Sequence, residues 1–407
     1  MRVSSVTMYE QSISSMNRQQ NDFLKVSQQI ASGRRVVNPS DDPQAASRAV
    51  GVDQARAVTQ QFADSRVSAR NSLAQTESVL NSIGDAITSA KTLMVQASSD
   101  TLSDADRESV ASELRGIYET VIGQANATDG NGRHLFGGYQ DSTEPFVRKT
   151  VGDETFIEYV GDDKGREQRI DASRKMKVAE SGLSIFDSVP SGAGYVAEAG
   201  AGNGGGITFS GPQVIDADLA SQGVAYSVAI NESGDVTVTD GNGDTVTSDV
   251  VKKDGVTRVE FGGLALELKG EPGADGDDTI AVNPADQGNT NLFESFEKAL
   301  AVLENPAETG AKKAALRNTL NTVMREFDNS LDNVLTKRAS VGARLNELDV
   351  VDSVGGNRML NYEQTLSDLV DLDYAEAIGD YSLRQVGLQA SQKAFADMKG
   401  MSLFNYL

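Results

Sequence analysis

The amino-acid sequence predicts a mainly α-helical protein with an inserted β domain, in which a bundle of long helices carries a coiled-coil segment at each end of the chain. Apolar residues recur at helical spacing through both flanks of the 407-residue chain. Between residues 188 and 285, by contrast, the chain holds 15 acidic residues, four basic residues and 18 of its 39 glycines. We therefore expect three parts: a terminal coiled-coil domain (1–45 and 360–407), a helical bundle domain with β-hairpins (46–187 and 286–359) and an acidic, glycine-rich β domain (188–285).

The first helix is expected to run from about residue 6 to Ser32. Its apolar side chains are spaced alternately three and four residues apart, which is typical of a coiled-coil seam. Gly33 and Pro39 predict its end, because glycine is favoured just after a helix and proline cannot continue one. The candidate assembly residues on this helix are Ile13, Met16, Phe23 and Ile30.

A second helix is predicted to begin at Pro43, because an aspartate or serine just before it can cap the free amide groups and proline suits the first helical turn. A third helix is predicted to begin near Ser103 and to end before the turn-forming residues 129–132. Residues 133–187 then alternate with a period of two and contain several glycines, which predicts hairpins.

Alternation inside the acidic segment predicts strands at 224–230, 236–238, 256–261, 264–269 and 279–282. Helix is predicted to resume at Asn291, and a long apolar seam follows from Leu316 to Leu348. The last helix repeats the coiled-coil spacing of the first. Its candidate assembly residues are Tyr374, Ile378, Tyr381, Leu388 and Phe395.

Composition excludes most enzyme chemistry. The formal net charge of −22 argues against binding to duplex DNA or to an anionic membrane, both of which need a basic surface. The chain has no cysteine, so it has no disulfide, thiolate metal site or cysteine nucleophile. Its single histidine, His134, excludes motifs that need two histidines. We expect no cofactor, no metal ion and no catalysis.

Two short motifs are better explained by local structure than by ligand binding. Residues 200–205 satisfy GxGxxG, but a strand-like run follows them, whereas a dinucleotide site needs a helix there. Residues 240–244 resemble the first half of a calcium loop, yet Thr245 and Val251 stand where such a loop needs glycine and glutamate. We expect a flexible loop in the first case and a hairpin turn in the second.

The sequence contains no apolar segment of the ~20 residues that a membrane-spanning helix needs, so no membrane insertion is expected. Its first residues lack the apolar stretch of a cleavable secretory signal. These observations leave open whether the protein stays in the cytoplasm or leaves by another route.

Several motifs resemble the bacterial flagellin family. Residues 30–35 (IASGRR), 38–43 (NPSDDP) and 131–138 (NGRHLFGG) are similar to its signatures, and so are residues 338–344 (RASVGAR). Near the far end, residues 373–378 (DYAEAI), 388–393 (LQASQK) and 403–407 (LFNYL) resemble the hook–filament junction proteins of this family more closely than flagellin itself. The resemblance covers residues 1–150 and 290–407.

The resemblance implies a structural protein at the junction between the flagellar hook and the filament. Its implied partners are copies of itself in a helical ring, hook-associated protein 1, flagellin, an export chaperone and the type III export apparatus. It also implies that the chain ends are disordered in the free subunit and that the protein is secreted to the flagellum without a cleaved signal peptide. Two alternatives stay open, a flagellin-type filament subunit and a surface adhesin that uses the acidic insert.

Overall fold

The computed structural model describes residues 5–99, 101–152, 154–273 and 278–400. Backbone contacts divide the chain into two compact units, Met1–Asp64 with Val350–Leu407, and Ser65–Asp349. Two long helices, α2 (Pro43–Ala97) and α7 (Gly310–Val370), contribute residues to both units. The mainly α-helical class with an inserted β domain is confirmed, whereas the division into three functional parts stays a prediction.

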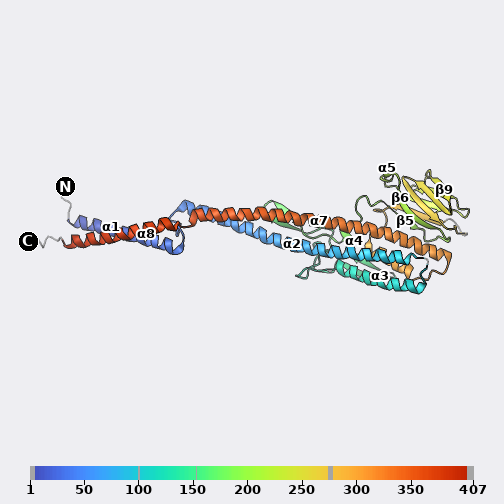
Figure 1. The fold of residues 1–407 in the computed structure, drawn as a ribbon, viewed down its shortest axis with the longest axis horizontal. Coiled ribbons are helices and arrows are strands. Elements are labelled where there is room, and N and C mark those ends of the chain that lie inside the picture. Colours follow the sequence, from blue (N-terminus) through green and yellow to red (C-terminus); the bar gives the residue numbers. More distant parts are fainter. Residues whose placement is uncertain (1–4, 100, 153, 274–277, 401–407) are drawn as a thin grey trace, which may run out of the picture. The chain divides into compact units, whose positions relative to one another are not determined.

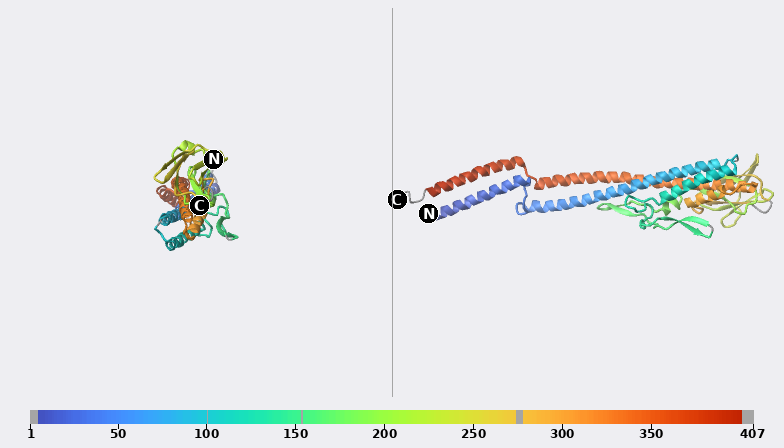
Figure 2. Two further views of the ribbon diagram at one scale, coloured as in Figure 1. Left: turned by 90° about the vertical axis from the view of Figure 1, so that its right-hand side faces the viewer. Right: turned by 90° about the horizontal axis from the view of Figure 1, so that it is seen from below.

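The first unit contains an antiparallel helix pair, α1 (Ser5–Ser32) and α8 (Tyr374–Gly400). Figure 1 and the right-hand view of Figure 2 show the two helices side by side. Helix α1 ends as predicted, because Gly33 has a φ of +69°, a left-handed value that glycine adopts without strain. Helix α2 begins at the predicted proline, and Asp42 Oδ1 accepts a hydrogen bond of 3.0 Å from Ala45 N.

The second unit contains a helical bundle of α3 (Asp104–Ala125), α6 (Leu292–Leu303) and the adjoining parts of α2 and α7. Ser103 caps α3 through a capping box, and the Asn291 side chain caps α6, so both predicted starts are confirmed. The predicted apolar seam of α7 supplies core residues, since Leu320, Val323 and Phe327 are fully buried.

Two hairpins confirm the change of period after α3. The first pairs β1 (Phe146–Val151) with β2 (Glu154–Tyr159), and the second pairs β3 (Glu167–Asp171) with β4 (Arg174–Lys177). A short helix, α4 (Leu183–Phe186), follows them. Phe146 packs against both Phe186 of α4 and Phe293 of α6, at ring-centroid distances of 5.0 and 5.1 Å. The first hairpin is thereby fixed to the bundle.

The β domain consists of two four-stranded antiparallel sheets with strand orders β6-β11-β10-β9 and β5-β12-β7-β8. Their inner faces share one apolar core, to which Val259 and Leu266 come from the first sheet and Val228 and Ile280 from the second. The strands are β5 (Tyr195–Ala199), β6 (Thr208–Val214), β7 (Tyr226–Ile230), β8 (Val236–Asp240), β9 (Asp249–Lys253), β10 (Val256–Phe261), β11 (Leu264–Lys269) and β12 (Asp278–Pro284), and helix α5 (Ala217–Ala220) lies between β6 and β7. Strands β10 and β11 have the predicted bounds. Strands β5 and β9 and helix α5 were not predicted.

Candidate assembly site

The pairing of α1 with α8 is set by two aromatic contacts. The rings of Tyr9 and Phe395 lie 5.4 Å apart, and those of Phe23 and Tyr381 lie 4.9 Å apart. Such pairs stabilise a helix interface beyond the area that they bury, typically by ~0.5–1.5 kcal/mol. Two of the predicted assembly residues, Phe23 and Tyr381, are therefore brought together across the antiparallel pair.

The predicted seam is only partly covered. Tyr374 and Ile378 are 51% and 55% exposed. The other seven predicted residues are half-buried: Ile13, Met16, Phe23, Ile30, Tyr381, Leu388 and Phe395. Two helices alone thus leave this apolar stripe in contact with water.

The apolar surface of the pair extends beyond the predicted seam. Leu383 and Val386 of α8 are 73% and 65% exposed, and Leu24 of α1 is 49% exposed. The fully covered positions are smaller residues that the heptad spacing did not single out, Val26 and Ala377. In the sequence, Leu24, Leu383 and Val386 stand out as apolar residues that lie outside the three-and-four spacing.

The loops that join these helices to α2 and α7 meet at a single joint. Leu372 N donates to Gly33 O at 3.1 Å, and Arg35 N donates to Val370 O at 2.8 Å. Arg35 Nη2 also donates to the backbone carbonyl oxygen of Leu369 at 2.7 Å. The IASGRR motif therefore contacts the chain just before α8 through backbone groups and through the side chain of Arg35.

Two ion pairs close the joint on the α1 side. Lys25 Nζ lies 3.0 Å from Asp41 Oδ1, and Arg35 Nη1 lies 3.1 Å from Asp42 Oδ2. A hydrogen bond from the Asn38 backbone, followed by the contact with Lys25, lowers the pKa of Asp41 below its ordinary value. Both aspartates of the NPSDDP motif are thus ionised structural groups, as the capping interpretation predicts.

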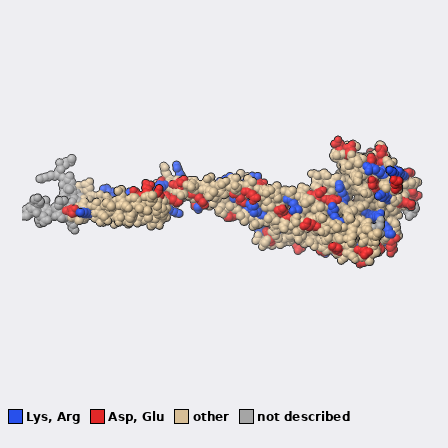
Figure 3. Space-filling model, viewed as in Figure 1, with Lys and Arg blue, Asp and Glu red and all other residues tan. Residues whose placement is uncertain are grey.

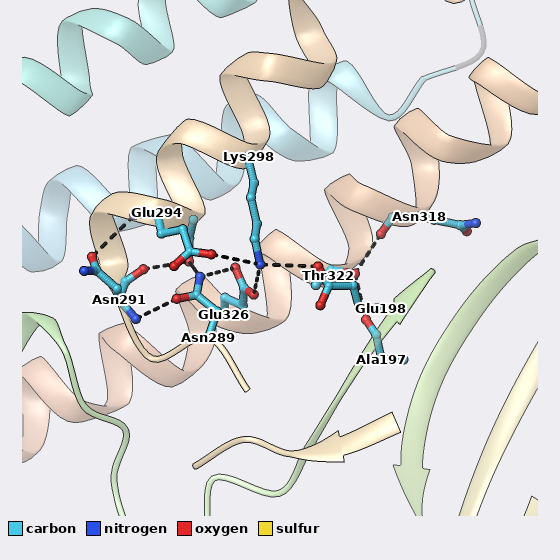
Figure 4. Close-up of polar contacts among 10 residues, drawn as sticks. Ala197, Glu198, Asn289, Asn291, Glu294, Lys298, Asn318, Thr322 and Glu326 are labelled. Carbon is cyan, nitrogen blue, oxygen red and sulfur yellow. Dashed lines mark hydrogen bonds and ion pairs between the residues drawn. The ribbon is translucent and has the colours of Figure 1, made fainter. Parts of the chain in front are cut away.

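The β domain is held on α7 by polar side chains that bind the backbone of its strands. Asn318 Nδ2 donates to Ile207 O at 2.9 Å, and Asn318 Oδ1 accepts from Phe209 N at 3.1 Å. Thr322 Oγ1 donates to Ala197 O at 2.7 Å, as Figure 4 shows. Strands β5 and β6 are edge strands, and edge strands carry free backbone groups. Helix α7 therefore takes the place of a further strand at these two edges.

A partly buried charge cluster lies beside these contacts. In Figure 4, Lys298 on α6 points toward Glu326 on α7 and Glu198 on β5, and its Nζ lies 3.4 and 3.3 Å from their carboxylates. Burial raises the pKa of Glu326, although Lys298 opposes this effect. Burial lowers the pKa of Lys298, but the surrounding carboxylates outweigh it and hold that pKa above its ordinary value. Lys298 is therefore a cation that links α6, α7 and the β domain.

The RASVGAR motif on α7 supplies a second buried ion pair. Arg344 Nη1 lies 2.6 Å from Glu180 Oε1, and Lys177 Nζ lies 2.7 Å from Glu180 Oε2. The Glu180 side chain is only 3% exposed. Burial by itself raises the pKa of a carboxyl group, but the hydrogen bonds from Lys177 and Arg344 lower the pKa of Glu180 overall. The motif thus fixes the second hairpin to α7.

The motifs that could have suggested chemistry have structural roles. His134 Nδ1 lies 2.8 Å from Asn126 O. Residues 240–244 form the expected turn, in which Asp240 Oδ1 accepts from the backbone of Asn242 and Asp244. The loop at 200–205 leads into β6, and Asn203 binds it to Thr279. Within the described ranges, no group of acidic or histidine side chains could hold a metal ion.

None of the helices in the described part of the chain is both long and apolar enough to cross a membrane. The terminal residues 403–407, which carry part of the family resemblance, lie outside the described residues.

Comparisons with known proteins agree with the observed arrangement of helical ends around a β domain. A family model for the bacterial flagellin N-terminal helical region matches residues 3–141. Flagellar hook-associated protein 3 of Escherichia coli strain K12 is 34% identical over 405 residues, which are 99% of each chain. The crystal structure of FlgL from Xanthomonas campestris is 28% identical with a TM-score of 0.67, and the match covers 78% of this chain and 99% of that chain.

A solved structure with lower sequence identity supports the fold assignment only. The flagellar junction protein FlgL from Legionella pneumophila has a TM-score of 0.66 at 21% identity, with 80% of this chain and all of that chain covered. The match to the Escherichia coli protein extends over the helical flanks and the β domain alike.

Proposed function

The chain belongs to the flagellar hook-associated protein 3 family, and we propose that its terminal helix pair is the part that builds it into the flagellum. The protein is a structural component of the flagellum and forms the junction between hook and filament. We propose that it contacts hook-associated protein 1 on one side and flagellin on the other, with copies of itself beside it in a helical ring.

The observation that carries the proposal is the uncovered apolar surface of α1 and α8. Four large apolar side chains of α8 are each more than half exposed: Tyr374, Ile378, Leu383 and Val386. Full burial of such a side chain stabilises a protein by ~1.5–3 kcal/mol. The isolated pair of α1 and α8 lacks this stabilisation at these positions, because it leaves the side chains exposed. Neighbouring copies that surround the pair supply the missing contacts.

The incomplete burial of these apolar side chains also supports the prediction that the ends are disordered in the free subunit. An isolated helix pair must offset the cost of helix nucleation and of ordering its residues, and polar residues interrupt its seam at Gln20 and Gln385. Ordering therefore accompanies assembly. In the free state the unfolded ends are available to an export chaperone and to the type III export apparatus, so that secretion needs no cleaved signal.

We also propose that the protein has no catalytic activity. Its similar proteins are structural parts of the flagellum, and the polar clusters of the described residues serve to hold strands and helices together. Of the alternatives that the sequence leaves open, neither the filament subunit nor the surface adhesin is favoured by an observation on this chain.

Complementation tests the proposed function. A strain that lacks this chain is expected to bear hooks without filaments and to release flagellin into the medium, and the intact chain should restore attached filaments. Limited proteolysis of the purified subunit should trim residues 1–45 and 360–407 first. A deletion strain that keeps firmly attached filaments would refute the junction role, and ends that resist proteolysis in the monomer would refute disorder before assembly.

A further inference from the structure

The contacts between α1 and α8 belong to a single antiparallel register. Phe23 lies two heptads after Tyr9, and Tyr381 lies two heptads before Phe395, so the two ring contacts of the pair describe the same alignment. Around them, buried or half-buried side chains recur at alternating spacings of three and four residues on both helices. This is the pattern of a coiled coil, so the two helices form an antiparallel one.

The large apolar side chains of this seam do not by themselves fix the register, because they repeat every seven residues. They are Tyr9, Met16, Phe23 and Ile30 on α1 and Tyr374, Tyr381, Leu388 and Phe395 on α8. If one helix slid along the other by one heptad, roughly 10 Å, Phe23 would face Leu388 or Tyr374 in place of Tyr381. Apolar matching therefore permits several registers, and other residues must select the observed one.

An ion pair near the middle of the helix pair distinguishes these registers. Arg384 occupies a half-buried seam position of α8, and its Nη1 lies 2.9 Å from Oδ2 of Asp22 on α1. A slip of one heptad would place Ser15 or Gln29 where Asp22 now lies, and neither residue carries a charge. Asp380 also lies 4.0 Å from Arg384, but it is on α8 and moves with Arg384 in every register. The ion pair with Asp22 thus depends on the alignment of the two helices.

The surroundings of Arg384 make the loss of Asp22 unfavourable. The Arg384 side chain is 37% exposed, and its Nε is buried with no hydrogen-bond partner among the described residues. Burying part of a guanidinium group is costly unless a carboxylate stays close to it. The other acidic residue of α1 is Glu10, far along the helix from Asp22. Figure 3 agrees, since uncharged residues form most of the visible surface over α1 and α8.

Gln19 of α1 belongs to the same polar level. A Cβ atom added at Gly387 would lie 2.8 Å from Gln19 Oε1, so the glycine leaves the room that this side chain occupies. A slip of one heptad would bring Ser12 or Val26 to Gly387 in place of Gln19. We call four residues the register layer: Gln19, Asp22, Arg384 and Gly387.

We propose that the register layer fixes the alignment of α1 with α8, with Arg384 and Asp22 as its positioning residues. The inference rests on the proposed function, because the ends order during assembly and must reach one alignment at that step. A polar residue inside a coiled-coil seam lowers stability but specifies the register, since misaligned pairs leave it without its partner. The joint between Leu372 and Gly33 favours the same alignment, but Arg384 lies roughly 18 Å further along α8 and acts on the middle of the pair.

Four variants test the role of Arg384. Arg384→Leu removes the positive charge from the seam and adds an apolar side chain. Arg384→Lys keeps the charge, and Asp22→Arg combined with Arg384→Asp keeps an ion pair across the same level. Arg18→Leu is the matched control, because it makes the same replacement at an exposed residue of α1.

The register is measured by disulfide formation within one chain in isolated hook–filament structures. The chain has no cysteine, so a pair of engineered thiols reports a single contact. Ser12→Cys with Ser391→Cys reports the observed register, because both residues are half-buried at the level between the Tyr9–Phe395 contact and Met16. Ser5→Cys with Ser391→Cys reports a slip, because residue 5 lies one heptad before residue 12.

With the parent register layer, the first cysteine pair should form at least tenfold more disulfide than the second. Arg384→Leu should lower this ratio at least threefold through a gain of the second link, and it should reduce the number of attached filaments. Arg384→Lys, the exchanged ion pair and Arg18→Leu should preserve both the ratio and attachment.

An unchanged ratio in Arg384→Leu would overturn the inference and leave the junction function intact. Loss of both links to the same extent would show that Arg384 only stabilises the pair, and would overturn the inference as well. Failure of the parent chain to attach filaments in the deletion strain would instead refute the junction function.

Discussion

The side chain of Tyr374 packs against Gly33, because a Cβ atom added at Gly33 would lie 3.0 Å from Tyr374 Oη. The two residues belong to segments more than 300 positions apart, and they meet where α1 ends and α8 begins. This contact, with the backbone bonds around it, makes the joint of the terminal unit a place where small changes should have large effects on assembly.

Replacing Gly33 with alanine should weaken assembly. The left-handed φ of +69° costs a residue with a Cβ atom ~1–2 kcal/mol, and the new methyl group presses on Tyr374. We expect fewer attached filaments when the variant is expressed in a deletion strain and the cells are sheared. Gly51→Ala is the control, because Gly51 lies inside α2 with no atom within 4 Å of an added Cβ. Equal filament retention in the two variants would contradict the role of the joint.

Replacing Leu383 with aspartate should block assembly without unfolding the subunit. Leu383 is 73% exposed, so the free chain loses little apolar burial, whereas a surrounding copy would have to bury a charge. Circular dichroism of the purified chain should match the parent while filament attachment is lost. Val151→Asp serves as the control, because Val151 is 66% exposed on the hairpin strand β1. A Leu383→Asp chain that attaches filaments normally would argue against the terminal surface.

Replacing Glu180 with glutamine should lower the stability of the chain at neutral pH by about 1–3 kcal/mol, because two charged partners lose an ionised acceptor. The lowered pKa of Glu180 means that its contribution is present at neutral pH and is lost as pH falls through that pKa. Chemical unfolding followed by circular dichroism should therefore show a gap between parent and variant at pH 7 that narrows toward pH 3.

Glu326→Gln is the matched contrast, because burial raises the pKa of Glu326. The folded state then binds the proton more tightly than the unfolded chain, so the contribution of this group is present at low pH and is lost as pH rises through the raised pKa. The two variants should shift the pH dependence of the unfolding free energy in opposite directions. Parallel shifts would contradict the assignment of the two environments.

Replacing Asn318 with alanine should loosen the β domain. The change leaves the buried carbonyl group of Ile207 and the N–H group of Phe209 without their partner, and a buried unpaired group costs ~1–3 kcal/mol. We expect a lower unfolding free energy and faster amide exchange in β6. Asn305→Ala is the control, since that exposed side chain bonds only to Ala301 O in its own neighbourhood. Unchanged exchange in β6 would contradict the capping of this edge by α7.

Local sequence patterns were sufficient to predict where three of the helices begin. The starts of α2 at Pro43, of α3 after Ser103 and of α6 after Asn291 follow from capping chemistry that involves only neighbouring residues. Strands β10 and β11 were equally clear, because their alternation is regular and a glycine pair separates them. Strand β9, with the sequence DVVKK, shows no alternation, since it lies at an open edge and all its residues are exposed.

The sequence by itself determined where the apolar stripes lie: on the two terminal helices, and along one side of α7 from Leu316 to Leu348. Only the tertiary structure decided that Val26 and Ala377 are covered while Leu383 is exposed, because that depends on the register of two helices far apart in the chain. It also decided that the polar side of α7 is buried, since Asn318 and Thr322 bind strand backbone more than 100 residues away. Spacing along a chain reports which residues share a face, but a polar face is solvated by default, and whether another segment covers it is a property of long-range packing.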